Sequence, residues 1–598
     1  MSVDQRLLLR RQPAPAVDRG DRLCPVFCVT DHLYRDARVA QDATLGRFHH
    51  LGVTLDLGRR PDWRTNPVAD VEWRIEWTKL YEGLHLAHAF AALGDAELLD
   101  TWQDLVESFC DQVPVGSDRS DVTARRLQNW LYAWQTFAAT PRYPGLRDGL
   151  ADRLRARIRD DAAHLSQHLT SERNHRTLEL YALVLVALAL GEQSEAERFL
   201  NDLADNAVAD IRPDGVHREC STDYHMIVLR SLIGAIVNAR LVEMPVPQRL
   251  VERTQLACDF ALHARRPDGV TPAVSDGDEE DYSELLALAA DVLYRPDLTW
   301  ASTNGRRGAR PPDLLASFPI GGYYVQRSGW GDGQRTYRDE RWALFDCGPI
   351  GDGGHGHYDQ LAVLASADGR ALLVDAGRYT YDPESPWRQW FKGTAAHNTV
   401  CVDRLDQTPY RPGKPSGETS TATFLGRVSH AGLDLLRGEV RSPAYDAVHV
   451  RTVAFVDGDY WIVHDQLRAP TAHIYEARWH LSPEAHDAVV IDDRGTQTTV
   501  CAPGVQLIAP AGAGEMSLQP GWFSPTYGTK VPAPIVVAQG VGADVDLLTV
   551  LAPGASPVAV QWVCGGGEVF VTVARSGTVD TISWRTNELA GTWVRTPC

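Results

Sequence analysis

The segment Arg212-Pro-Asp-Gly-Val216 recurs unchanged, 54 residues further along the chain, as Arg266-Pro-Asp-Gly-Val270. Each copy lies between segments with helical periodicity, and Pro-Asp-Gly is common turn chemistry. A repeat of this length fits one helical hairpin with its loops, arranged repeatedly around a ring. Two copies of a turn sequence can coincide by chance, but inside an all-helical region they favour an incomplete (α/α) toroid.

The helical pattern extends over residues 71–305 on both sides of this repeat. Residues 73–84 place apolar side chains at i, i+4, i+7 and i+11, and residues 127–137 carry a second apolar stripe. Both stripes are typical of amphipathic helices that pack on neighbours. Residues 178–190 are apolar nearly all round and stop at Gly191, which predicts a helix enclosed on all sides with a glycine end signal.

The second half of the chain has the pattern of antiparallel β-structure. Residues 303–312, with the sequence TNGRRGARPP, have the composition of a linker. Beyond them, short alternating or β-branched segments are joined by Asp368-Gly369 and Asp457-Gly458, which predict tight hairpin turns. We therefore predict an antiparallel β-sandwich domain over residues 313–598, following the toroid. Residues 1–70 are rich in proline and arginine, and we expect an irregular N-terminal segment there.

Composition narrows the class of protein. A chain of 598 residues is too long for one hydrophobic core, so the fold class is multidomain α and β. The formal net charge of −19 argues against a nucleic-acid partner, which requires a basic face. It also argues weakly against a heavily sulfated substrate, although a local basic cleft can overcome the net charge. The 17 Trp and 19 Tyr are ample for a carbohydrate-binding cleft, while most are expected in the core.

Targeting signals and cysteine pairs are not evident. The first residues contain only a three-leucine apolar run before two arginines, and the longest apolar run is far short of the ~20 residues that span a bilayer. The ten cysteines are scattered without a CxxC pair, which predicts buried thiols. We expect a cytoplasmic protein with no membrane partner, and a homodimer is possible.

Two histidines and one carboxylate lie at predicted strand ends. His357 precedes a strand, Asp375 ends the strand after the Asp368-Gly369 turn, and His397 begins a third strand. Adjacent antiparallel strands bring their ends together, and two His with one carboxylate can form a zinc site with an open fourth position. Spacing alone favours strand-end side chains that are hydrogen-bonded to turns, with zinc as the alternative.

Three further groups of polar residues carry candidate chemistry. His355 is separated from His357 by one glycine, so an extended backbone places both side chains on one face. A glycine-rich surface loop with solvated histidines is the simpler interpretation. Tyr224 falls early in an apolar-patterned helix, where a core tyrosine is the simpler interpretation. Asn174 precedes a helix, where it can be an N-cap.

In their order along the chain, these groups resemble the signatures of the heparinase II/III-like polysaccharide lyases. The matching motifs are N-H before a helix, D-G-x-x-x-E-x-S-x-x-Y-H at residues 214–225, G-H-G-H-x-D at 354–359, L-x-D-x-G at 373–377 and A-H-N-T-V at 396–400. Residues 124–134 and 268–278 also resemble the helical domain of the family, and the likeness covers roughly residues 70–480. The resemblance implies a lyase that cleaves uronic-acid-containing poly- or oligosaccharides by β-elimination and gives an unsaturated uronate.

The resemblance also implies residue roles. Asn174 matches the asparagine that neutralises the substrate carboxylate, and His175 matches a neighbouring histidine that assists as base in some members. Tyr224 matches the catalytic tyrosine, and His355 matches the catalytic histidine of the β-domain. Which of these two is the base stays open, because it can depend on the configuration at C5.

The remaining motif residues have supporting or metal-binding roles in the resemblance. His357, Asp375 and His397 match the zinc ligands, where the metal mainly holds the cleft in shape. Glu219 and His225 are expected to support substrate binding rather than chemistry.

Two positions depart from the family pattern. Arg173 stands where members often carry asparagine, and it adds a cation for an acidic substrate or shifts the choice of substrate. Tyr358 follows the metal histidine where a small residue is common, which narrows the cleft.

The chemistry explains why such groups are needed. The C5 proton of a uronate is weakly acidic while its carboxylate is ionised, so a hydrogen-bond donor such as Asn174 must stabilise the enolate-like intermediate. A base then takes the proton and an acid protonates the leaving oxygen, for which histidine and tyrosine are suited. These roles require Asn174, Tyr224 and His355 to meet at one cleft.

Three alternatives stay open at this point. A glycoside hydrolase on an α/α toroid needs two facing carboxylates, for which Asp276, Asp278 or Glu219 are candidates, but it leaves the His and Tyr groups unexplained. A non-catalytic carbohydrate-binding or scaffold protein would keep the aromatic residues without needing Tyr224 beside His355. A cytoplasmic eliminase acting on a small metabolite or natural-product glycoside keeps the lyase chemistry with a short substrate.

Overall fold

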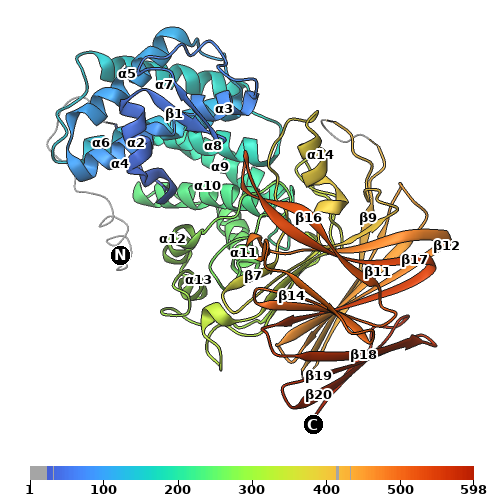
Figure 1. Ribbon diagram of the computed structural model, residues 1–598. Coiled ribbons are helices and arrows are strands. Elements are labelled where there is room, and N and C mark those ends of the chain that lie inside the picture. Colours follow the sequence, from blue (N-terminus) through green and yellow to red (C-terminus); the bar gives the residue numbers. More distant parts are fainter. Residues whose placement is uncertain (1–22, 31, 413–416, 431, 598) are drawn as a thin grey trace. The chain divides into compact units, whose positions relative to one another are not determined.

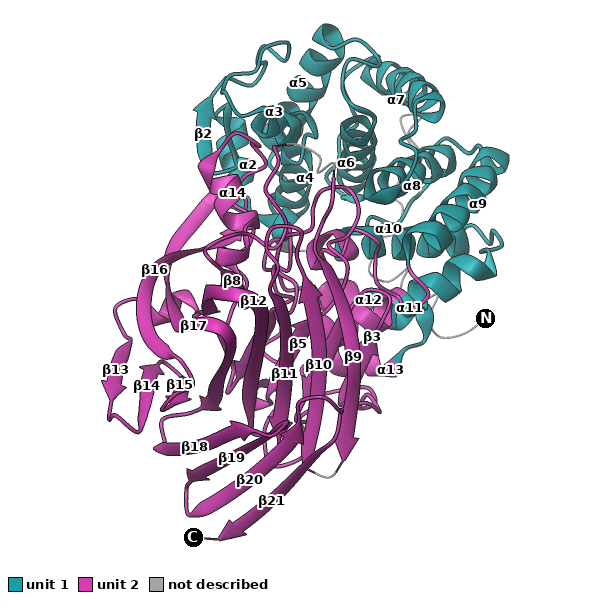
Figure 2. Cartoon of the chain, turned by 90° about the vertical axis from the view of Figure 1, so that its right-hand side faces the viewer, with its two compact units in different colours: residues 1–211, 226–256, 288–295 teal, residues 212–225, 257–287, 296–598 magenta. Residues whose placement is uncertain are grey.

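The computed structural model describes residues 23–30, 32–412, 417–430 and 432–597 (Figure 1). The chain forms two compact units, drawn in two colours in Figure 2. Unit 1 comprises Met1–Ile211, Met226–Leu256 and Leu288–Arg295, and unit 2 comprises Arg212–His225, Ala257–Ala287 and Pro296–Cys598. Residues 1–22, on which the expected absence of a secretory signal rests, lie outside the described residues.

Unit 1 is built from helical hairpins. α4 packs on α5, α6 on α7 and α8 on α9, while α4 also packs on α6 and α6 on α8. Alternate helices therefore form one layer and their hairpin partners form the other, which is the predicted incomplete (α/α) toroid. The helices are α3 (Val71–Thr78), α4 (Glu82–Leu93), α5 (Ala96–Gln112), α6 (Ser120–Ala139), α7 (Leu150–Gln167), α8 (Arg173–Ala189) and α9 (Gln193–Asp210).

Helix α8 is the enclosed helix that the sequence predicts. Every residue from 177 to 189 is buried, and Gly191 follows with a φ of 76°, a left-handed conformation that ends the helix at little cost for glycine. The one acidic residue of this stretch, Glu179, accepts hydrogen bonds from Ser120 Oγ and from the backbone and hydroxyl of Thr170.

Part of the N-terminal segment has regular structure. Residues 32–56 form the 3-10 helix η1 (His32–Arg35), helix α2 (Ala37–Thr44) and a hairpin of β1 (Arg47–His50) and β2 (Val53–Asp56). Asp36 starts α2 by accepting a hydrogen bond from the backbone N–H of Arg38. The 1–70 segment, which composition predicts to be irregular, is therefore folded over these residues.

The sheets of unit 2 form three layers. A ten-stranded sheet, with β12 and β17 at its centre, lies between a five-stranded sheet and a four-stranded sheet, and all paired strands are antiparallel. Within β12, Trp461 and Val463 pack toward the five-stranded sheet, whereas Tyr460 and Ile462 pack toward the four-stranded sheet. Because successive side chains of a strand point to opposite faces, a strand covered on both faces has a continuous apolar run. The predicted sandwich is thus present with a further layer.

The remaining bounds are as follows. The helices are α10 (Thr222–Leu241), α11 (Gln248–Ala264), α12 (Ser283–Leu293), α13 (Pro296–Ser302) and α14 (Pro386–Lys392), with 3-10 turns η2 (Tyr337–Asp339), η3 (Thr394–Ala396) and η4 (Pro483–Ala485). The five-stranded sheet contains β3 (Leu315–Phe318), β4 (Tyr323–Arg327), β5 (Trp342–Asp346), β6 (Val363–Ala367) and β7 (Arg370–Leu373). The ten-stranded sheet contains β8 (Val400–Val402), β9 (Thr421–His430), β10 (Leu433–Arg441), β11 (Val448–Val456), β12 (Tyr460–His480), β13 (Val490–Asp493), β14 (Gln497–Ala502), β15 (Val505–Pro510), β16 (Glu515–Thr526) and β17 (Thr529–Pro553). The four-stranded sheet contains β18 (Val558–Gly565), β19 (Glu568–Arg575), β20 (Thr578–Arg585) and β21 (Gly591–Pro597).

The predicted turns are confirmed. Asp368 and Gly369 join β6 to β7 with φ angles of 52° and 73°, and Asp457 and Gly458 lie between β11 and β12 with φ angles of 50° and 62°. Positive φ at both positions matches the right-handed twist of a hairpin, which is why Asp-Gly is favoured there.

The two copies of the Arg-Pro-Asp-Gly-Val repeat form the same turn. In each copy the arginine N–H donates to the valine carbonyl, at 2.9 Å, and the glycine N–H donates to the arginine carbonyl. The first turn follows α9 and leads to Tyr224, while the second follows α11 and leads to Asp276. A repeated helix-ending turn therefore delivers two of the residues that matter below.

The described part of the chain has no helix that is both long and apolar enough to cross a membrane. Its cysteines are all free thiols, and Cys220, Cys258, Cys347 and Cys401 are buried as predicted. Cys24 and Cys501 are exposed, so the prediction of buried thiols is wrong for these two.

Candidate active site

Tyr224 lies in the first turn of α10, where Ser221 fixes the helix start. The Ser221 hydroxyl accepts a hydrogen bond from the Tyr224 backbone N–H at 3.3 Å, in the manner of an N-cap. The same hydroxyl donates to the carbonyl of Asp276 at 2.7 Å. Ser221 thus ties the segment that carries Tyr224 to the segment that carries Asp276.

The ring of Tyr224 contacts the ring of His355. Their centroids are 4.2 Å apart at an interplanar angle of 35°. His355 lies in the loop between β5 and β6, and its carbonyl accepts a hydrogen bond from the Asp276 N–H at 3.1 Å. The requirement from the sequence that Tyr224 lie within reach of His355 is met.

Asp276 is fully buried and is the centre of a polar network. Its Oδ2 lies 3.0 Å from His355 Nδ1, and its Oδ1 lies 2.9 Å from His357 Nε2. Arg388, on α14, donates to both carboxylate oxygens, with Nη2 at 2.8 Å from Oδ2. Burial alone would raise the pKa of Asp276, but the Arg388 guanidinium and the two histidine hydrogen bonds hold it well below 3.8.

An ionised Asp276 determines the tautomer of both histidines. A carboxylate can only accept, so His355 donates through Nδ1 and keeps its lone pair on Nε2. The side chain of His355 is 20% exposed, so solvent can reach the ring that carries this lone pair. By the same argument His357 donates through Nε2, and its lone pair is on Nδ1, a buried atom without a hydrogen-bond partner.

A second chain of polar groups leads away from Tyr224. The Tyr224 and Tyr381 hydroxyls lie 2.9 Å apart, and the Arg378 guanidinium donates to the Tyr381 oxygen. Asp278 binds Arg378 through both carboxylate oxygens, at 3.0 and 2.7 Å. Burial and the neighbouring Tyr381 raise the pKa of Tyr224 well above 10, so its hydroxyl is protonated at neutral pH.

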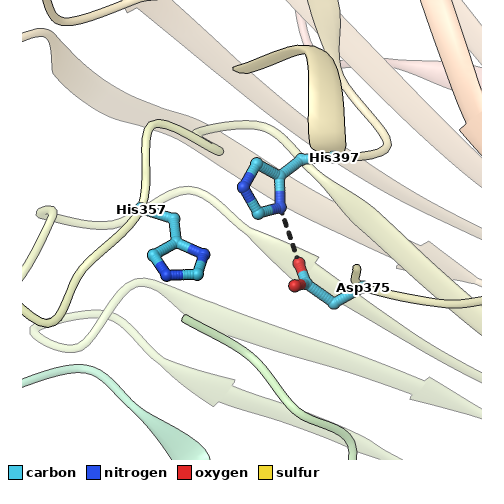
Figure 3. Close-up of side chains that lie close together, drawn as sticks. All are labelled: His357, Asp375 and His397. Atoms are coloured by element: carbon cyan, nitrogen blue, oxygen red, sulfur yellow. Dashed lines mark hydrogen bonds and ion pairs between the residues drawn. The ribbon is translucent and has the colours of Figure 1, made fainter. Parts of the chain in front are cut away.

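His357, Asp375 and His397 form a buried group that can hold a metal ion, as Figure 3 shows. One ligand atom of each residue lies within 4.8 Å of the others. His397 Nδ1 lies 2.8 Å from Asp375 Oδ2, whereas His397 Nε2 and His357 Nδ1 are buried without a partner. Buried polar atoms are normally satisfied, so two orphaned imidazole nitrogens beside a carboxylate fit a cation-binding site.

The charges of this group agree with cation binding. Burial lowers the pKa of His357 to about 4, which leaves the neutral ring that a metal requires. Burial also lowers the pKa of His397, but Asp375 outweighs burial and raises it to about 9, so without a metal a proton sits between ring and carboxylate. A bound cation would displace one proton from His397.

The other predicted site residues of the helical half belong to unit 1. Asn174 is buried in the first turn of α8, and the His175 side chain is 34% exposed with Nε2 at 3.8 Å from Asp121. Arg173 Nε lies 4.0 Å from the carboxylate of the preceding Glu172. The predicted roles of Arg173, Asn174 and His175 stay predictions.

Glu219 and His225 are buried in unit 2. His225 Nε2 bonds to the carbonyl of Ala257 at 2.9 Å, and burial lowers the pKa of His225 to about 4. A neutral histidine bonded to a carbonyl in the middle of α11 holds α10 in place, which favours the supporting role over direct substrate contact.

Sequence reasoning missed Asp276, Arg388, Arg378 and Tyr381 as members of the site. It considered Asp276 and Asp278 only as carboxylates for a hydrolase. Each of these two carboxylates is bound by an arginine instead, so neither is available as the free acid or base that glycoside hydrolysis needs. Asp276 comes six residues after the second repeat turn and Tyr224 comes eight residues after the first, so nearness to a repeat turn is the signal that the two residues share.

Two family models match successive parts of the chain. The model of the heparinase II/III N-terminus matches residues 35–294, and the model described as heparinase II/III-like, C-terminal, matches residues 310–575. A heparin-sulfate lyase of Bacteroides stercoris is 22% identical over 525 residues, covering 80% of this chain and 75% of that protein. The crystal structure of heparinase III has a TM-score of 0.78 at 16% identity, covering 97% of this chain and 95% of its own. A mutant heparan sulfate lyase from Pedobacter heparinus has a TM-score of 0.67 at 20% identity, covering 99% and 93%.

Proposed function

The chain belongs to the heparinase II/III-like family, and we propose that it is a lyase that cleaves uronic-acid-containing poly- or oligosaccharides by β-elimination. The observation that carries this proposal is the contact between Tyr224 and His355, with Asp276 bonded to Nδ1 of the histidine. Two proton-transfer groups of different character stand side by side, as an elimination requires. The family assignment from the ordered sequence motifs is confirmed.

In the proposed mechanism His355 is the base. Asp276 accepts the Nδ1 hydrogen, which leaves the Nε2 lone pair to take the C5 proton of the uronate. The imidazolium that forms is stabilised by the ionised Asp276, whose charge is balanced by Arg388 when the histidine is neutral. Asp276 thus orients His355 and stabilises the product of the proton transfer.

Tyr224 is the acid in this mechanism. Arg378 can only donate, so it fixes the Tyr381 oxygen as an acceptor and leaves the Tyr381 hydrogen available to the Tyr224 oxygen. The hydrogen of Tyr224 is then available to the leaving O4 oxygen. As the C4–O bond breaks and the C4–C5 double bond forms, the phenolate of Tyr224 accepts from Tyr381.

The carboxylate of the substrate needs a donor, and we assign this part to Asn174, with Arg173 and His175 beside it in sequence. One such donor is typically worth about 3 kcal/mol of transition-state stabilisation. This assignment rests on the resemblance of the Asn174-His175 motif to the family.

We propose that the buried metal group binds zinc through His357, Asp375 and His397. Two imidazoles and one carboxylate suit zinc, which when bound would supply a fixed positive charge that holds the three strand ends together. We expect purified protein to hold about one zinc per chain, and His397→Ala to lower zinc affinity by more than roughly 10²-fold. Elemental analysis and thermal unfolding with and without a chelator measure this.

A matched control for the metal prediction is His486→Ala, since His486 is 51% exposed in the same unit and belongs to no metal group. It should keep both the metal content and the unfolding temperature. Protein without metal, and with an unfolding temperature that chelators leave unchanged, would remove zinc from the proposal.

The lyase is tested by absorbance during incubation with alginate, heparan, hyaluronan and chondroitin oligosaccharides. Elimination creates a conjugated unsaturated uronate that absorbs in the ultraviolet, whereas hydrolysis does not. We expect a rise with at least one substrate and its loss, by about 10²–10⁴-fold, in His355→Ala. New reducing ends without absorbance would overturn the lyase in favour of hydrolysis. The cytoplasmic location and the homodimer stay predictions.

A further inference from the structure

A half-buried lysine lies among three aromatic rings on unit 2. The Lys530 ammonium is 4.3 Å from the ring centroid of Trp387, 4.5 Å from that of Trp522 and 5.1 Å from that of Tyr379. The Trp387 and Trp522 rings meet edge to face at 5.6 Å. We call Lys530, Trp387, Trp522 and Tyr379 the lysine cage.

The cage holds the ammonium without neutralising it. Among the residues that the structure describes, no carboxylate lies within ion-pair distance of Lys530, although the chain has a net charge of −19. Ring faces attract a cation through their quadrupole and accept no conventional hydrogen bond, so they position the charge and leave its N–H donors available. Lys530 is also one of only four lysines among 59 basic residues.

The cage is built from segments that also carry partners of Tyr224 and Asp276. Tyr379 stands two residues before Tyr381, whose hydroxyl meets that of Tyr224. Trp387 and Arg388 are neighbours on α14, and Arg388 binds Asp276 and lies over the Tyr381 ring at 5.4 Å.

Trp522 and Lys530 come from the β16–β17 hairpin, whose turn presents Tyr527 to the Tyr381 ring at 5.1 Å. In Figure 2, α14 lies beside the end of β16, and both belong to unit 2.

We propose that the lysine cage is a subsite for an acidic sugar residue of the substrate, next to the residue that is cleaved. This inference rests on the proposed function and deepens it. The indole faces of Trp387 and Trp522 can pack against the apolar face of a pyranose ring, and Lys530 binds the oxyanion that the ring carries. The oxyanion is a carboxylate or a sulfate ester, since an ammonium is a point charge that suits both.

The subsite explains how a strongly acidic protein can bind an acidic chain. A single unpaired cation in the proposed subsite raises the local potential where the substrate binds, whatever the net charge of the whole surface. It also predicts that binding weakens with salt, because a half-buried charge is partly screened.

The test uses the full chain with Tyr224→Phe, which is expected to slow turnover by about 10²–10⁴-fold, and measures binding by calorimetry. The ligands are an oligosaccharide with carboxylates only, its sulfated counterpart and a neutral oligosaccharide of the same length. We expect Lys530→Gln to raise the Kd for an acidic ligand by roughly tenfold. Lys530→Arg should keep part of the affinity that the Gln variant loses, and neither variant should change binding of the neutral ligand.

The two acidic ligands show whether Lys530 binds a carboxylate or a sulfate ester. If Lys530→Gln weakens binding of both ligands equally, Lys530 binds the carboxylate. If it weakens binding of the sulfated ligand alone, Lys530 binds the sulfate ester. If the Gln variant does not fold, Lys530→Met keeps the stem packed among the rings and gives the same test. The matched control is Arg494→Gln, which removes a charge that is 73% exposed in the β13–β14 turn of the same unit.

Acidic ligands that bind Lys530→Gln within about twofold of the parent, or that do not bind the parent at all, would overturn the subsite. The two proposals fail separately. Lysine-dependent binding without any elimination by the unmodified chain keeps the subsite and overturns the lyase. Elimination with lysine-independent binding does the reverse.

Discussion

Replacing Tyr224 with phenylalanine is expected to lower kcat for formation of the unsaturated uronate by about 10²–10⁴-fold. The substitution removes only the hydroxyl, which lies 2.9 Å from that of Tyr381 and is the proposed proton donor to the leaving oxygen. The ring that contacts His355 stays in place, so KM and the unfolding temperature should change little. Initial rates from product absorbance, together with a melting curve, measure both quantities.

Two further variants test the direction of the hydrogen bonds that run from Arg378 through Tyr381 to Tyr224. Tyr381→Phe removes the hydroxyl that donates to Tyr224 but keeps Tyr224 itself as the proton donor. Its loss of activity should therefore be smaller, roughly tenfold. Tyr294→Phe is the control, because Tyr294 is 63% exposed in unit 1 and takes no part in the site. Full activity in Tyr224→Phe with a severe loss in Tyr381→Phe would transfer the acid role to Tyr381.

The sequence allowed the type and order of the elements to be predicted, because helical and strand periodicities are local. The enclosed helix α8 and the Asp-Gly hairpins follow from such signals. The third sheet layer does not follow from local signals. A run such as residues 460–463 shows that both faces of a strand are buried, but it is equally apolar whether a helix or a second sheet covers the other face. The pairing of β12 with β17 joins Trp461 to Leu551, and tertiary packing rather than local pattern selects such partners.

The candidate site divides in the same way. Tyr224 and His355 lie in motifs that could be matched to a family, so their pairing could be expected before the structure was known. Asp276 and Arg388 could not, because they are 112 residues apart, and an arginine in a short helix has the pattern of a solvated surface residue. Only the packing of α14 brings that charge against a buried carboxylate.

Asp276→Asn is expected to reduce both activity and stability. An amide has one acceptor oxygen and a donor nitrogen, so it cannot accept all the bonds that both histidines and both arginine nitrogens donate. Because the amide is neutral, Arg388 becomes a buried charge without a counter-charge. Breaking a buried pair in this way typically costs about 3–5 kcal/mol in the free energy of unfolding. The loss of the acceptor on His355 Nδ1 should lower kcat by about 10²–10⁴-fold, measured well below the unfolding temperature.

The double variant Asp276→Asn with Arg388→Met separates these two effects. Removing the arginine with its partner takes away the unpaired charge and leaves an apolar side chain of similar length, so much of the stability should return. Activity should not return, because neither change restores the charged carboxylate that binds His355 Nδ1. Chemical denaturation and product absorbance on the same preparations give both values. Recovery of activity together with stability would mean that Asp276 only holds the fold, and that His355 keeps its tautomer and orientation without it.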